Sequence, residues 1–284
     1  MIPGGSRRDK WARLIQDRLF RLSKPWRRVN EDAIHVFGCQ KSGTSAVAHL
    51  TALAGGLSAT VDIPTIWRTP VSAVVNGQLE VEDLIQTHRP YFSRDLVKEP
   101  TLAPIMDEVA ASIGLRKVVF VIRDPETNVR SRLQRCGLAG DLEDFSADDV
   151  QHILKESWHW TYDWPYRYKA QSRFWSGDRH YVEGLGILWC SCVEAMQRAT
   201  QQGVDVHVVR YEDFERDKQG TVEGILEAFN RPVCQDVSPH LNVRFQPKGN
   251  RSISIEAFFG ERNLARLNTI TSSHAGFFGY GQTN

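Results

Sequence analysis

Short apolar runs alternate with longer amphipathic stretches along most of this chain. Four short runs are mostly apolar, which is typical of buried strands: 33–38, 96–100, 117–123 and 204–210. Apolar residues recur at helical spacing in longer stretches, at about 43–54, 101–113, 181–202, 218–229 and 261–272. Strands that alternate with helices predict a parallel sheet covered by helices, and therefore an α/β fold.

The segments between these elements predict the domain organisation. Residues 57–95 have weak periodicity and several prolines and glycines, so loops and short helices are expected there. Residues 148–175 are dense in aromatic side chains and are expected to belong to a helical lid around 140–180. The chain has 284 residues, which is enough for one large α/β core, and we expect that domain over residues 30–284.

Residues 1–29 are rich in Lys and Arg, and their apolar residues recur at helical spacing. This pattern predicts an amphipathic helix. Two interpretations remain open: the helix contacts an anionic membrane surface, close to a lipid acceptor, or it packs on the domain and exposes its charges.

Composition narrows the choice of partners and location. The net charge of +1 argues against a protein that binds bulk nucleic acid. No apolar run approaches the ~20 residues needed to cross a bilayer, and no signal peptide is visible, so we expect a soluble, cytoplasmic protein. The five cysteines are scattered and form no C-x-x-C pair, so no metal site is expected.

The first predicted strand leads into a loop with the glycine spacing of a phosphate-binding loop. Gly38 and Gly43 bound this loop, and a helix follows it directly. Backbone N–H groups in such a loop curl around an anion, and the start of the helix adds a partial positive charge. The lysine that usually follows the second glycine lies inside the loop instead, at Lys41.

A second group of polar residues follows the strand over 117–123. Arg123 ends this strand, Asp124 and Pro125 are typical of a helix start, and Ser131 falls in the second turn of that helix. Ligands of open α/β sheets bind at the carboxyl ends of the strands, so Arg123 is expected at a binding edge.

The loop sequence Lys41-Ser-Gly-Thr-Ser45, together with Arg123-Asp-Pro and Ser131, resembles the sulfotransferases that use 3′-phosphoadenosine-5′-phosphosulfate (PAPS). A third stretch, Arg210-Tyr-Glu-Asp-Phe214, is similar to another segment of that family. The loop is closer to the bacterial and carbohydrate members, because Gln40 and Ala46 stand where cytosolic members carry proline and tryptophan. The resemblance implies a three-layer fold like that of P-loop NTPases, with a central parallel sheet flanked by helices.

The resemblance also implies roles for individual residues. Lys41 would reach the oxygen that bridges phosphate and sulfate, and Arg123 with Ser131 would bind the 3′-phosphate. Lys248 and Arg251 lie in a basic segment similar to one that closes over the same phosphate. The residues expected to bind the donor, or its product 3′-phosphoadenosine-5′-phosphate (PAP), are Gln40, Lys41, Ser42, Gly43, Thr44, Ser45, Arg123, Ser131, Lys248 and Arg251.

A sulfotransferase also needs a group that takes a proton from the acceptor hydroxyl. Lys98-Glu99-Pro100 partly matches the family segment that carries this group. Glu99 is the first candidate for the base and His88 the second, while Lys98 is expected as a second cation near the sulfate. Glu99 as a salt-bridged strand end and His88 as an ordinary loop residue are the alternatives.

These patterns together predict a PAPS-dependent transferase that acts on a hydroxyl of a glycan, a glycolipid or a natural product. A P-loop kinase or NTPase is the alternative enzyme, although it would need a lysine after Gly43 and a magnesium-binding aspartate at the strand end where Arg123 stands. A protein that binds the nucleotide without catalysis is the alternative outside enzymes.

Overall fold

The structure is a computed structural model, and it describes residues 27–63, 66, 71, 73–74, 77–146, 149–150, 179–243 and 252–281. Several predictions fall on residues outside this part. They concern the basic segment up to residue 26, most of the aromatic segment 148–175, and the two tail residues Lys248 and Arg251.

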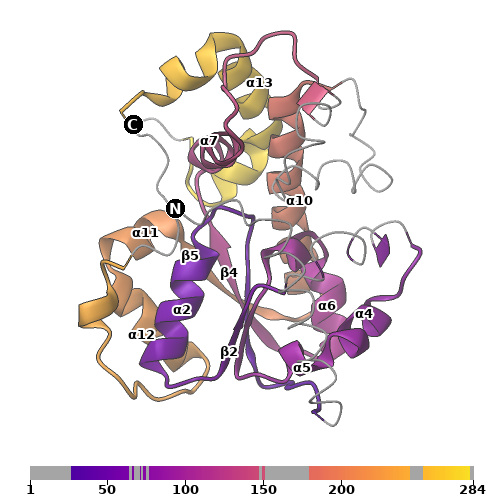
Figure 1. The fold of residues 1–284 in the computed structure, drawn as a ribbon, viewed down its shortest axis with the longest axis vertical. Coiled ribbons are helices and arrows are strands. Elements are labelled where there is room, and N and C mark those ends of the chain that lie inside the picture. The colour runs from indigo at the N-terminus through magenta and orange to yellow at the C-terminus, as the bar shows by residue number, and fades with distance from the viewer. Residues whose placement is uncertain are drawn as a thin grey trace, which may run out of the picture.

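A five-stranded sheet lies at the centre of the described chain, and its strands pair in parallel in the order β2-β3-β1-β4-β5 (Figure 1). β4 is buried along almost its whole length, as its continuous apolar sequence predicts for a central strand. The strands are β1 (Ile34–Phe37), β2 (Ala59–Val61), β3 (Leu96–Lys98), β4 (Lys117–Ile122) and β5 (Asp205–Arg210).

Helices cover both faces of this sheet (Figure 1). The α-helices are α2 (Thr44–Ala54), α4 (Val81–Thr87), α5 (Arg89–Phe92), α6 (Met106–Ile113), α7 (Pro125–Cys136), α10 (Tyr181–Gln201), α11 (Tyr211–Arg216), α12 (Lys218–Ala228) and α13 (Ile255–Phe277). Two 3₁₀ helices are η1 (Pro100–Ile105) and η2 (Ser238–His240).

Each face of the sheet has its own hydrophobic core. Phe37 and Phe120 pack with apolar side chains of α4, α6 and α10 on one face. Val36 and Val121 pack with α2 and α12 on the other. Successive side chains of a strand point to opposite faces, so neighbours such as Phe120 and Val121 belong to different cores. This arrangement confirms the predicted α/β fold with a central parallel sheet flanked by helices.

A third core joins α7, the first half of α10 and α13, which lie beyond the upper end of the sheet in Figure 1. Val129 and Leu133 of α7 pack there with Leu185 of α10 and Leu267 of α13. α7 is thereby held close to the carboxyl ends of β1 and β4.

The predicted strands are all present, but three details of the sequence prediction were wrong. β2 lies in the segment predicted as loops and short helices; it has only three residues, too few for a visible alternation. The predicted helix over 101–113 begins as the 3₁₀ helix η1, which contains Pro104, and becomes α-helical only at Met106. α13 is longer than the predicted 261–272. Ser254 is its N-cap residue, with the hydroxyl accepting from the Ala257 N–H, and the helix continues through a kink at Gly260.

The strand order places a switch point between β1 and β4. The chain leaves β1 toward β2, through α2, and leaves β4 toward β5, on the opposite side of the sheet. Where two neighbouring strands send their connections in opposite directions, a crevice opens at their carboxyl ends. The predicted loop follows β1 and Arg123 follows β4, so both lie at this crevice.

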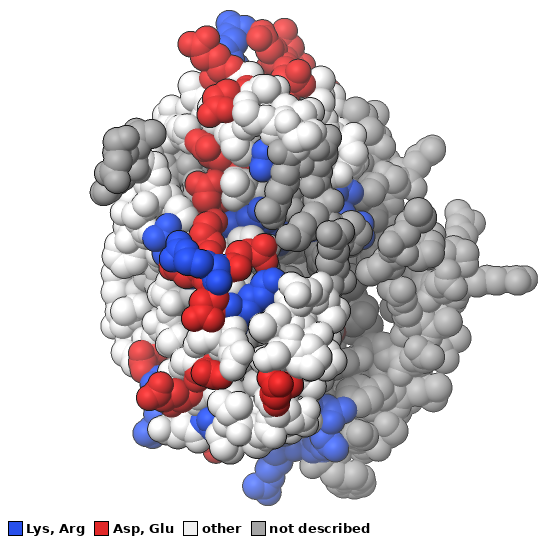
Figure 2. Space-filling view, turned by 90° about the vertical axis from the view of Figure 1, so that its left-hand side faces the viewer, with Lys and Arg blue, Asp and Glu red and all other residues white. Residues whose placement is uncertain are grey.

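Among the described helices, none has the length and hydropathy that crossing a membrane requires. On the face drawn in Figure 2, Lys and Arg side chains lie among Asp and Glu side chains rather than apart from them. This mixture agrees with the net charge near zero.

Candidate functional site

The loop between β1 and α2 has a backbone that only a few residue types accept easily. Gly38, Lys41 and Gly43 have positive φ values of 146°, 71° and 90°. A Cβ at Gly38 would collide with the Val121 carbonyl, and one at Gly43 would collide with the Tyr211 ring. Alternation of left- and right-handed residues forms a concave array of N–H groups that suits an anion.

α7 holds this loop from one side. Asn128 is fully buried, and its Nδ2 donates to the Gln40 carbonyl (2.9 Å) and to Ser42 Oγ (3.0 Å). Arg123 Nη1 donates to the Lys41 carbonyl (3.0 Å). The loop carbonyls are therefore bound by α7 and the end of β4. The N–H groups from Gly43 to Ser45 begin a helix and have no acceptor within it.

Four cations lie around the loop. Burial lowers the pKa of Lys41 to about 8, and the nearby charges of Arg135, Arg123 and Lys98 act in the same direction. A group of like charges that depresses the pKa of its own member favours the binding of an anion. Sequence reasoning missed Arg135, although it lies on α7 four residues after Ser131, and residues four apart share a helix face.

Arg123 is buried and held in one orientation. Its Nε donates to Thr127 Oγ1 (3.1 Å), and its guanidinium carbon lies 4.7 Å from the centre of the Tyr211 ring. Trp189 Nε1 donates to the Arg123 carbonyl (3.0 Å). Ser131 is half-buried one helical turn after Thr127, so the face of α7 that carries it also contacts Arg123.

Lys98 reaches the loop from the other side. It is buried at the end of β3, and its Nζ donates to Ser45 Oγ (3.0 Å) and forms an ion pair with Asp62. Asp62 directly follows β2 and was missed by sequence reasoning. The one available signal was that a lysine at a buried strand end needs a counter-ion.

Glu99 lies beside Lys98 but points into the protein. Its side chain accepts from the Thr101 N–H (2.9 Å), from Thr101 Oγ1 (2.6 Å) and from the Ile63 N–H (2.6 Å). It caps η1 and is only 2% exposed. Burial and, next, the charge of Asp62 raise the pKa of Glu99 to about 7, against the opposing effect of Lys98.

His88 is not brought to the loop. It is buried between α4 and α5, where its Nδ1 lies 2.8 Å from the Leu84 carbonyl oxygen. The Asn30 N–H, which precedes β1, donates to the Phe92 carbonyl of α5 (2.9 Å). α5 therefore lies near the amino ends of the strands, at the bottom of the sheet in Figure 1, opposite to the loop.

The end of β5 is closed by residues of the Arg210–Phe214 stretch. One Glu212 oxygen accepts from the Asp124 N–H (3.2 Å), and the other accepts from the Tyr280 hydroxyl (2.6 Å). The Arg210 guanidinium carbon lies 4.6 Å from the centre of the Tyr280 ring. These contacts join the ends of β4 and β5 to the C-terminal tail.

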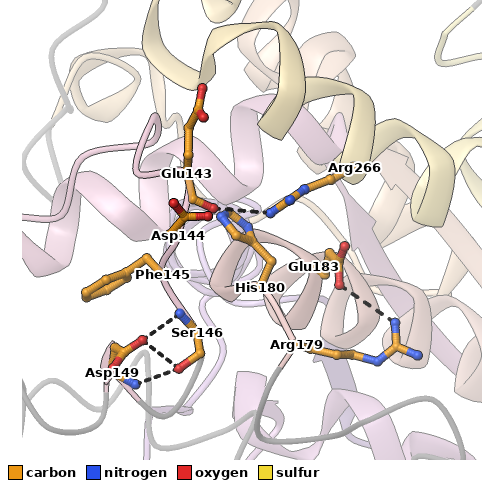
Figure 3. A pocket seen from close by; sticks show the side chains of 9 residues that line it. All are labelled: Glu143, Asp144, Phe145, Ser146, Asp149, Arg179, His180, Glu183 and Arg266. Carbon is orange, nitrogen blue, oxygen red and sulfur yellow. Dashed lines mark hydrogen bonds and ion pairs between the residues drawn. The ribbon is translucent and has the colours of Figure 1, made fainter.

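A cavity of about 470 Å³ lies elsewhere, at the start of α10 (Figure 3). Its charged side chains have both signs, and Arg179 pairs with Glu183 across 3.8 Å. His180 lines this cavity, and Trp189, which donates to the Arg123 carbonyl, comes nine residues later. Nine residues of helix span about 14 Å, so the cavity is separate from Arg123. Of the predicted donor-binding residues that the structure describes, none lines this cavity.

The loop also holds a buried side-chain amide, that of Gln40. The Gln40 side chain is 4% exposed, and in the described part of the chain neither its Nε2 nor its Oε1 has a hydrogen-bond partner. A buried amide of this kind is completed by a polar ligand at little cost, whereas leaving it unsatisfied is expensive. The described residues contain no group of three or more His, Cys, Asp or Glu placed to hold a metal ion.

No family model matches this chain, and no curated protein sequence matches it. Several solved structures resemble it, including two sulfotransferases. One is the sulfotransferase domain from the Synechococcus PCC 7002 olefin synthase, at 12% identity; the match covers 90% of this chain and 97% of that one, with a TM-score of 0.48. The other is sulfotransferase STF1 from Mycobacterium tuberculosis H37Rv, at 12% identity, with 90% and 81% covered and a TM-score of 0.48. At this identity the reaction of the chain must be argued from its own residues.

Proposed function

We propose that this protein is a sulfotransferase that moves the sulfuryl group of PAPS to an acceptor hydroxyl. One observation supports this choice above the others. Lys41 lies inside the phosphate-binding loop, and the residue that follows the neighbouring strand β4 is an arginine that donates to the loop. A triphosphate enzyme would use this strand end for a carboxylate that holds magnesium.

The loop would bind the 5′ side of the donor. The N–H groups at the start of α2 and the side chain of Lys41 would contact the 5′-phosphate. When the S–O bond to that phosphate breaks, negative charge gathers on the oxygen left behind. An ammonium that is already in place stabilises this charge without reorganisation.

The end of β4 would bind the other phosphate. Arg123 and Ser131 would contact the 3′-phosphate, and Arg135 on the same face of α7 would add a further positive charge. Lys248 and Arg251 would close over it from the tail. A phosphate at this place would distinguish PAPS from nucleotides that lack the 3′ group.

The acceptor is proposed only as a class: a hydroxyl of a glycan, a glycolipid or a natural product. Binding of a lipid acceptor would agree with a basic amphipathic segment at residues 1–29 that contacts the membrane surface. A cytoplasmic location belongs to the same proposal. All five cysteines are free, as is usual for proteins of the cytosol, which keeps thiols reduced.

Two measurements test the proposal. Calorimetry should show that PAP binds far more tightly than 5′-AMP, and radiolabelled PAPS should label at least one compound in a panel of glycans, glycolipids and phenols. Magnesium-dependent turnover of ATP without PAP binding would favour a kinase or NTPase. Tight PAP binding without transfer to any hydroxyl would favour a protein that binds the nucleotide without catalysis.

A further inference from the structure

Two carboxylates lie beside Lys98, and they differ in access. The Asp62 side chain is 33% exposed, whereas Glu99 is 2% exposed. The oxygens of Glu99 already accept from Thr101 and Ile63. A base must come within hydrogen-bond reach of the hydroxyl that it deprotonates. Of these two carboxylates, Asp62 is the one that an acceptor can approach from solvent.

The backbone places Asp62 at the binding edge of the sheet. The Asp62 N–H donates to the Lys98 carbonyl (2.9 Å), which extends the pairing of β2 with β3 by one residue. Its φ is then 69°, in the left-handed region. A non-glycine residue persists there only when its surroundings fix it, and such residues gather at functional sites.

Asp62 is linked to the phosphate-binding loop through a single side chain. Its carboxylate pairs with Lys98 Nζ, and the same Nζ donates to Ser45 Oγ, 3.0 Å away, in the first turn of α2. His49, one turn further along α2, has an exposed surface, but its imidazole is partly desolvated. This desolvation and the charge of Lys98 lower the pKa of His49, while Asp62 opposes the effect. The carboxylate therefore lies next to the place where the loop would hold the sulfate.

We propose that Asp62, rather than Glu99 or His88, takes the proton from the acceptor, an inference that rests on the proposed function. The acceptor oxygen forms a bond to sulfur, and its proton passes to the Asp62 carboxylate. The S–O bond to the 5′-phosphate breaks, and its electron pair stays on the phosphate oxygen beside Lys41. Lys98 holds Asp62 in position and faces the transferring group.

Two acceptors of different acidity test this role. An aliphatic hydroxyl keeps its proton until attack and needs a base, whereas p-nitrophenol is already ionised to a large extent. In Asp62→Asn, kcat for the aliphatic acceptor found in the panel should fall about 10²–10⁴-fold, and kcat for p-nitrophenol should fall much less. Asn accepts a left-handed φ, so the variant should fold.

Asp95→Asn is the matched control, since Asp95 precedes β3 at the opposite end, and its carboxylate accepts, among the described contacts, only from the N–H and the hydroxyl of Ser58. It should change neither rate. Equal loss for both acceptors in Asp62→Asn, or loss of PAP binding, would mean that Asp62 only holds Lys98. A selective loss of the aliphatic reaction in Glu99→Gln or His49→Gln would move the role to that residue. If the wild-type protein transfers sulfate to no hydroxyl, the proposed function fails and this assignment fails with it.

Discussion

The carboxyl ends of β4 and β5 differ from those of β3 and β2 in what their charged side chains bind. On the β4–β5 side, Arg123 donates to the Lys41 carbonyl, and Glu212 accepts from the Asp124 N–H and the Tyr280 hydroxyl. On the β3–β2 side, Lys98 pairs with a partly exposed Asp62 and donates to Ser45.

This difference suggests a division of work across the switch point. Charges that bond to backbone groups and to buried hydroxyls fix the shape of the loop, because removing one partner leaves the other unsatisfied. Charges that stay partly exposed remain available to a second reactant. We expect the β4–β5 side to determine nucleotide affinity and the β3–β2 side to determine turnover. Asp62→Asn, described above, tests the β3–β2 side, and the following variants complete the comparison.

The largest effect is expected at Lys41, which belongs to neither side. Lys41→Ala should lower kcat by about 10²–10³-fold or more, because the charge that forms on the leaving phosphate loses its ammonium. Both residues carry a Cβ at the same left-handed φ, so the free energy of unfolding should change little. Steady-state transfer and urea denaturation would measure the two quantities. Near-normal turnover would contradict the role of Lys41.

Arg123→Ala should act mainly on the nucleotide. A charge-assisted bond to phosphate contributes roughly 1.5–3 kcal/mol, so the affinity for PAP should fall about 10–100-fold. The affinity for 5′-AMP should fall less, since that nucleotide lacks the 3′-phosphate. Calorimetry with both ligands would measure the ratio. An equal loss would mean that Arg123 acts only through its bond to the Lys41 carbonyl.

Glu99→Gln should act on stability and on its dependence on pH. The folded protein raises the pKa of Glu99 from 4.5 to about 7, so between these values it binds more protons than the unfolded chain. Its free energy of unfolding should therefore fall as pH rises through this window. Glu99→Gln lacks this titrating group. Across this pH window the free energy of unfolding of the wild type should therefore fall by about 1 kcal/mol or more compared with that of the variant. Denaturation at a series of pH values would show the difference; parallel curves would contradict it.

The last variant changes Tyr280, on the β4–β5 side. Tyr280→Phe removes one bond to the Glu212 carboxylate and should lower the free energy of unfolding by about 1–2 kcal/mol. Thermal or urea denaturation would measure the loss. PAP affinity measured on the same protein should stay within a few-fold of wild type, and a loss as large as that of Arg123→Ala would break the proposed separation.

The sequence predicted best where local signals were strong. The strand, the glycine-bounded loop and the helix that follows were found close to their predicted bounds, because apolar runs and glycines act locally. Asp124 caps α7 as predicted, with its carboxylate accepting from the Thr127 N–H (2.8 Å). The order of the strands then brought the loop and Arg123 together.

The β3–β2 side was harder to predict, because it depends on pairing between distant segments. β2 has three residues and acquires its identity from its register with β3, where Val61 lies opposite Lys98. Without β2 there was no reason to place Asp62 beside Lys98. Glu99 was predicted as the base because Lys98-Glu99-Pro100 partly matches the family segment that carries this group, yet its side chain turns inward to cap η1. The position of a residue in the sequence indicated the end of the sheet at which it lies. It did not indicate the direction in which its side chain points.

The burial of Lys41 among other cations would couple the binding of a nucleotide to the uptake of a proton. Because the pKa of Lys41 is about 8 in the free loop, Lys41 is neutral in a fraction of the molecules in mildly alkaline solution. A bound phosphate would raise that pKa, so binding at about pH 8 would draw a fraction of a proton from the buffer. Affinity would then decrease as pH rises beyond this value. Calorimetry in buffers that differ in their heat of ionisation would record the uptake directly.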